Sequence, residues 1–217
     1  MFRFLRRLFL VVFILLIAGL TYALWPRKGD LRGFDVDAVA RLETGMWRDY
    51  YAKDYQSLAR QLYTMYRDIY HFSPADSAQL AYNAGQAAKV FQPTGSRAEA
   101  QVALPFLVRY YTLLRDQSGE TFEVEKAAKL ELDWWQLRRE NATAQQYGEV
   151  VAEVAEVVFD AQNEHVSKSG VLRAEMMRYR DDRRNGAMTE EDWAHIEKHL
   201  IEAYRELKTG VSRTPGA

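Results

Sequence analysis

The sequence predicts an all-α protein in which an N-terminal transmembrane helix is followed by a soluble bundle of helices. Two observations carry this prediction. Leu8 to Trp25 is a run of 18 residues without a charge, and in the rest of the chain apolar residues recur at steps of three or four, the helical period. Signals for helix starts separate these apolar stripes. The sequence therefore predicts helices joined by short turns, and no strand.

Residues 1–25 are interpreted as a membrane anchor with a basic start. A helix rises about 1.5 Å per residue, so Leu8 to Trp25 extends roughly 27 Å, close to the roughly 30 Å of a bilayer's hydrocarbon core. A cleavable signal peptide is the alternative, with Thr21 and Ala23 as the small residues of a cleavage site. The length of the uncharged run and the interfacial position of Trp25 favour a retained anchor.

The orientation of this segment is predicted from its flanking charges. Three basic residues precede the apolar run and three follow it, so the free amino terminus decides. We expect the N-terminus in the cytoplasm and the helical body outside it. The lipid bilayer is thus the expected partner of Leu8 to Trp25.

Composition excludes several function classes. The formal net charge is -1, and residues 1–30 hold five basic residues against Asp30, which is +4 and leaves -5 for the body. A mildly acidic body argues against a nucleic-acid binder, which needs a basic surface. The chain has no cysteine, which excludes disulfides, cysteine-ligated zinc and thiol catalysis.

The remainder divides into a linker at 26–35, a helical domain at 36–210 and a flexible tail at 211–217. Proline, glycine and charged residues mark the linker. The first predicted helix is long and rich in tyrosine, from Val39 to Ile69. Further helices are predicted to begin at Ser73, at Ser96 with a break near Pro105, at Thr121, at Thr143, at Gly170 and at Thr189.

A solenoid-like stack of helical hairpins is the alternative to a bundle. Leu80 to Gly85 has only a faint similarity to a tetratricopeptide motif, and the 34-residue period of such repeats is missing. A bundle is therefore preferred.

Three charged residues fall on apolar helix faces. At 100° per residue, Glu131 and Arg138 lie in the middle of the broad apolar face of the helix that ends near Glu140, and Glu43 lies within an aromatic stripe of the first helix. A carboxylate buried among aromatic rings must be paired, hydrogen-bonded or shifted in pKa.

These residues define a candidate polar pocket of Glu43, Glu131 and Arg138. Its predicted walls are aromatic: Trp47, Tyr50, Trp134 and Trp135. In this interpretation the carboxylates are acid/base candidates and Arg138 is an anion clamp. The alternative is a structural ion pair that clamps two helices.

No metal or cofactor is expected. His195 and His199 have the spacing of two ligands on a helix but no third partner, so unliganded histidines are preferred. Asp181 to Asp192 fits a calcium loop only in part, because Arg183 stands where an oxygen ligand is needed.

The function favoured by the sequence is a single-pass, membrane-anchored module that binds a protein partner or organises an envelope complex. The alternative is a small-ligand-binding protein or an enzyme that uses the Glu/Arg/aromatic pocket. The chain has no recognisable catalytic motif or phosphate-binding loop, so an enzymatic role is left open but not favoured.

Overall fold

The computed structural model describes residues 2–25, 27–183, 186 and 188–212. Within these ranges the regular structure is helical, with one short 3₁₀ turn, one π-helical turn and no strand. This confirms the all-α prediction. Residues 213–217 of the predicted tail lie outside the described ranges, whereas Val211 is buried at the end of the last helix.

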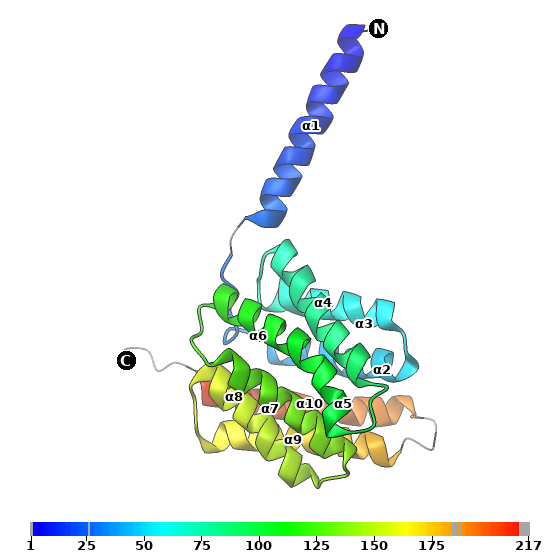
Figure 1. The fold of residues 1–217 in the computed structure, drawn as a ribbon, viewed down its shortest axis with the longest axis vertical. Helices are drawn as coiled ribbons and strands as arrows, with labels where there is room; N and C mark the ends of the chain where they lie inside the picture. The colour runs from blue at the N-terminus through cyan, green and yellow to red at the C-terminus, as the bar shows by residue number, and fades with distance from the viewer. Residues whose placement is uncertain (1, 26, 184–185, 187, 213–217) are drawn as a thin grey trace.

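Helix α1, Phe2–Leu24, projects away from the body (Figure 1). The stretch Arg6–Leu24 is long and apolar enough to cross a membrane, and none of its most apolar part is buried in the protein. A signal sequence near an N-terminus meets the same criteria. Near the end of α1, Arg67 of the body donates a hydrogen bond to the Tyr22 hydroxyl over 2.7 Å.

The helices of the body follow one another with short connections. Their bounds are α2 Val36–Ala52, α3 Tyr55–Thr64 with the π turn Met65–Ile69, α4 Pro74–Phe91, α5 Arg97–Ala100 with the 3₁₀ turn Gln101–Ala103, α6 Leu104–Ser118, α7 Val124–Arg139, α8 Ala144–Phe159, α9 Glu164–Asp182 and α10 Glu190–Val211.

Each long helix packs against the next one, and the last packs against the first. The neighbours run from α2 through α3, α4, α6, α7, α8 and α9 to α10, and α10 in turn contacts α2. Because neighbours are joined by short connections, they are antiparallel. The order of neighbours therefore closes into a ring.

The segment between α1 and α2 is fixed to one end of this ring. The Gly29 amide donates to the Gln117 carbonyl, and Arg32 donates to Glu120 and to the carbonyls of Phe159 and Val211. These partners lie at or just beyond the ends of α6, α8 and α10. We call this end of the body the linker end, and the opposite end the far end.

The predicted long first helix is wrong. Lys53 takes a left-handed conformation with φ 59°, which ends α2, and the Asp54 side chain accepts from the Ser57 amide to start α3. The chain thus reverses where the apolar period alone predicted continuity. The expected cap at Thr121 is also wrong, because α7 begins at Val124 after Glu123.

Other helix starts are confirmed. Ser73, Ser96, Thr143 and Thr189 each accept a hydrogen bond from the amide three residues on, and the last two form capping boxes. The 3₁₀ turn before α6 confirms the break near Pro105, which occupies the first turn of α6.

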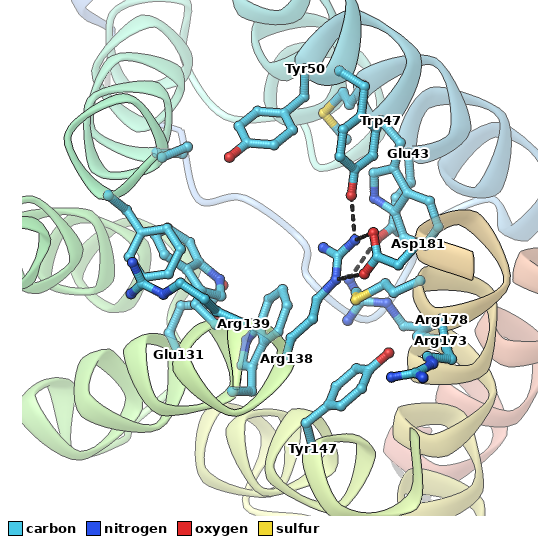
Figure 2. A pocket seen from close by; sticks show the side chains of 18 of the residues that line it. Glu43, Trp47, Tyr50, Glu131, Arg138, Arg139, Tyr147, Arg173, Arg178 and Asp181 are labelled. Atoms are coloured by element: carbon cyan, nitrogen blue, oxygen red, sulfur yellow. Dashed lines mark hydrogen bonds and ion pairs between the residues drawn. The ribbon is translucent and has the colours of Figure 1, made fainter. Parts of the chain in front are cut away.

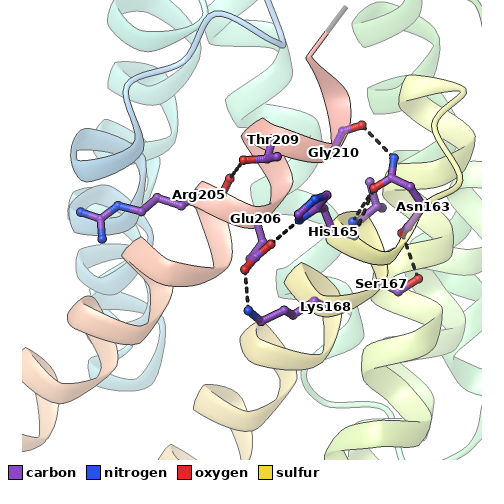
Figure 3. Close-up of polar contacts among 9 residues, drawn as sticks. Asn163, His165, Ser167, Lys168, Arg205, Glu206, Thr209 and Gly210 are labelled. Atoms are coloured by element: carbon purple, nitrogen blue, oxygen red, sulfur yellow. Dashed lines mark hydrogen bonds and ion pairs between the residues drawn. The ribbon is translucent and has the colours of Figure 1, made fainter.

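Helix α9 starts earlier than the sequence predicts. Asn163 accepts hydrogen bonds from the amides of His165 and Val166, and its Nδ2 donates to the Gly210 carbonyl over 2.9 Å (Figure 3). Gly170 is therefore inside the helix, where it packs directly on Gly148 of α8. The predicted boundary at Gly170 is wrong, because this glycine lies within α9 and permits a close helix crossing.

Candidate functional site

A cavity of about 660 Å³ lies inside the ring and receives side chains from α2, α3, α4, α7, α8 and α9. All seven residues of the predicted pocket line it: Glu43, Trp47, Tyr50, Glu131, Trp134, Trp135 and Arg138. Figure 2 shows Glu43 and Asp181 on one side of this space and Glu131 on the other, with Arg138 extended toward Asp181.

Small residues on α4 leave room for the cavity. Ala84, Gly85 and Ala88 line it at helical spacing, and a Cβ built on Gly85 meets no atom within 4 Å. The face of α4 that lines the cavity therefore carries only hydrogen atoms and methyl groups at these three positions.

Glu43 is buried, with 5% of its surface exposed. Its Oε1 accepts from Arg173 Nη2 over 2.6 Å, and its Oε2 accepts from the Tyr204 hydroxyl. Glu43 on α2 is thereby tied to α9 and α10. This carboxylate has the ion pair that a buried charge needs.

Arg138 is satisfied in the same way by a different helix. Its Nε and Nη2 donate to the two carboxylate oxygens of Asp181 over 2.8 and 2.9 Å, and Nη2 also donates to the Tyr51 hydroxyl. The fork of two parallel hydrogen bonds fixes the guanidinium on α9. Its donors therefore face a carboxylate of the protein itself.

Glu131 differs from both. Its Oε2 accepts from the Tyr111 hydroxyl and its Oε1 from Trp135 Nε1, each over 3.0 Å, and both donors are neutral. Among the described residues, the arginines Arg138 and Arg173 that line the same cavity form their ion pairs with Asp181 and Glu43 and not with Glu131. Burial raises the pKa of this carboxyl above its ordinary value, although its hydrogen bonds and the positive charge of Arg173 oppose that shift. Glu131 keeps partial exposure because it faces the cavity.

The three predicted charges line one cavity without bonding to one another. Each is held by a residue that sequence reasoning missed: Arg173 for Glu43, Asp181 for Arg138 and Tyr111 for Glu131. A signal existed for α9, because Arg173, Met177 and Asp181 recur at steps of four and line the cavity together. The stripe lies inside the helix predicted to begin at Gly170, but the spacing on one helix does not identify its partners on another.

A second cavity of about 320 Å³ continues inward. It shares Glu43, Glu131 and Arg173 with the first cavity and adds the tyrosines Tyr66, Tyr70, Tyr110, Tyr111 and Tyr204. Burial raises the pKa of Tyr110 to about 12, so its hydroxyl is neutral at pH 7. Two residues of the linker, Leu31 and Phe34, line this inner space.

The outer cavity opens at the far end of the body. Its exposed lining residues are Asn141, Arg178 and Asp182, which follow or end α7 and α9 at the end opposite the linker. The space therefore runs from a charged mouth at the far end toward a tyrosine-rich interior near the linker end.

The described residues contain no cluster of three or more side chains suited to a metal. His195 stacks on Tyr179 with ring centroids 4.5 Å apart, and His199 Nδ1 lies 2.9 Å from the His195 carbonyl. Asp181 and Asp192, the ends of the partial calcium motif, are bound to Arg138 and to the Thr189 cap. Asn185 of that motif lies outside the described residues.

No protein family, curated protein or solved structure matches this chain. Its function is therefore argued from the cavity itself.

Proposed function

We propose that the protein is a membrane-tethered domain that binds a small organic ligand in its central cavity. The cavity carries this proposal: its volume of about 660 Å³ lies within the roughly 300–1,000 Å³ typical of ligand sites. Its lining combines aromatic walls with charged groups, most of which are paired with one another. A core built only for stability is packed at crystal density and leaves no such space.

Two of the three charged residues predicted for the pocket have a structural role. Glu43 and Arg138 are consumed by ion pairs that join α9 to α2 and α7. We assign them to the frame of the site. Glu131, whose partners are neutral, is the carboxyl left to meet a ligand.

A protein partner, the first expectation from the sequence, has weaker support. The large apolar side chains exposed in the described part of the body are Tyr55, Tyr82 and Val102. Three single side chains do not form the extended apolar patch that marks a docking surface. The cavity therefore has more of the features of a binding site than the outer surface has.

For the membrane topology we propose what the sequence predicts: α1 is a retained anchor, the N-terminus is cytoplasmic and the body is outside the cytoplasm. The contact between Arg67 and Tyr22 supports retention, since cleavage after Ala23 would remove it. With the mouth at the far end, the ligand enters from the aqueous phase and not from the bilayer. An alkaline-phosphatase fusion after Ala217 is expected to be active, and a fusion active only in the cytoplasm is expected to be silent.

The test of binding uses the full chain in lipid nanodiscs and a library of small aromatic compounds, with tryptophan fluorescence as readout. Ala88→Leu places a larger side chain in the cavity, whereas Ala78→Leu makes the same change at an exposed position of the same helix. Compounds that bind the parent chain should be lost in Ala88→Leu and kept in Ala78→Leu. Equal binding to both variants, or no binder at all, would contradict the proposal.

A further inference from the structure

The charges that line the outer cavity are arranged in pairs, with two exceptions. Arg173 is paired with Glu43, Arg138 with Asp181, and Arg178 with Asp182 over 3.0 Å. The charged lining residues outside these pairs are Glu131 and Arg139. Glu131 would favour a positively charged ligand and Arg139 a negatively charged one, so the preferred charge depends on which of these two residues the ligand contacts.

Arg139 is already held by the wall of the cavity. It donates to the Thr94 carbonyl and hydroxyl and to Gln136 Oε1, and its guanidinium lies 4.1 Å from the centroid of the Phe91 ring. It is also eight residues beyond Glu131 on α7, roughly 12 Å farther toward the far end at 1.5 Å per residue. Arg139 therefore belongs to the mouth.

Glu131 lies deeper, where the two cavities meet. The charged residues that line both cavities are Glu43, Glu131 and Arg173, which carry a net charge of -1 when Glu131 is ionised. Trp134 and Trp135 also line both cavities, whereas Trp47 and Tyr50 line the outer cavity only. A carboxylate beside aromatic side chains resembles the sites for organic cations, in which ring faces and a negative charge replace the water around an ammonium group.

We propose that the cavity selects an organic monocation, a primary ammonium or a quaternary ammonium ion, whose charged group lies beside Glu131, where Trp134 and Trp135 line both cavities. The proposal rests on the function proposed above and specifies its ligand class. A cation supplies the direct ion-pair partner that Glu131 lacks among the described residues, whereas an anion there would face a carboxylate whose hydrogen-bond donors are neutral. The size of the combined space leaves room for an apolar or aromatic body behind the ammonium group.

The test compares three probes of similar size on the full chain in nanodiscs, with empty nanodiscs as blank: benzyltrimethylammonium, benzyl alcohol and benzoate. Calorimetry at pH 7 should show the cation binding at least tenfold more tightly than the neutral alcohol or the anion. Because the comparison uses the unmodified protein, it does not depend on how any variant folds.

Glu131→Gln should reduce the affinity for benzyltrimethylammonium about tenfold and leave benzyl alcohol unchanged. Glu125→Gln, an exposed change on the same helix, should change neither. If Glu131→Gln unfolds, Glu131→Asp replaces it and should bind the cation more tightly than it binds benzoate. Preference for benzoate, or a cation affinity that Glu131→Gln leaves intact, would overturn the cation proposal while the cavity remains a binding site. Failure of all three probes, together with no library compound that Ala88→Leu displaces, would overturn the proposed function itself.

Discussion

Glu43 on α2 and Arg173 on α9 form an ion pair beside the central cavity, with Oε1 and Nη2 2.6 Å apart. The two residues are 130 positions apart in the chain. Together with the bond from Tyr204 of α10 to the same carboxylate, this pair connects three helices around the point where the ring closes.

Loss of the Glu43 charge should destabilise the fold. Removing one partner of a buried ion pair costs about 3–5 kcal/mol, and we expect about 2–3 kcal/mol for Glu43→Gln because the Arg173 side chain is 25% exposed. Thermal unfolding followed by circular dichroism measures the effect. The double variant Glu43→Gln with Arg173→Met should recover most of the loss, since no charge is then left buried. A double variant no more stable than the single one would show that the pair is not the source.

The pH dependence of stability should reveal Glu131. Its folded pKa is raised by burial, so between the ordinary carboxyl pKa and the raised value the folded state keeps a proton that the unfolded chain releases. The free energy of unfolding therefore falls as pH rises through this window and is constant above it. Glu131→Gln removes this contribution.

The measurement is the melting temperature of both proteins from pH 4 to pH 8. The difference, parent minus Glu131→Gln, should become more negative as pH rises from about 4.5. A difference that stays flat across this range would mean that Glu131 titrates as an exposed carboxyl does.

The crossing of α8 and α9 should tolerate no side chain at Gly170. A Cβ there would overlap the Gly148 carbonyl and approach the Ala152 amide nitrogen to 2.6 Å, so backbone atoms would have to move. We expect Gly170→Ala to lower the free energy of unfolding by about 3 kcal/mol, as overpacking at a rigid contact does.

Gly85→Ala is the matched control for this change. It adds the same methyl group to a helix whose neighbourhood is open, and should raise stability by up to about 1 kcal/mol through helix propensity. Equal effects at the two glycines would contradict the close packing of α8 on α9.

Periodicity in the sequence predicts most of the helices and the seven lining residues. Residue spacing alone is enough to place a charged residue on an apolar helix face. The partners of those charges cannot be predicted in this way, since Arg173 and Asp181 lie on another helix and the period of one helix does not show which residues of a second helix it meets. The sequence also does not predict the chain reversal at Lys53, because a lysine in the left-handed conformation gives no sequence signal of the kind that glycine gives. Ring closure depends on α10 meeting α2 across the whole chain, which local patterns do not encode.

Asn163 should be the strongest single polar contributor to the start of α9. Its Oδ1 caps two amides of α9 and its Nδ2 holds the Gly210 carbonyl of α10, so one side chain serves two helices (Figure 3). Loss of an N-cap costs about 1 kcal/mol and loss of a further hydrogen bond about 1 kcal/mol more, so Asn163→Ala should cost about 2 kcal/mol.

Ser167→Ala is the control, because its exposed hydroxyl makes only a 3.3 Å bond to the Asn163 carbonyl and its removal should change stability by less than about 0.5 kcal/mol. Urea unfolding at pH 7 distinguishes the two, and an Asn163→Ala effect no larger than that of Ser167→Ala would mean that α9 does not depend on this cap.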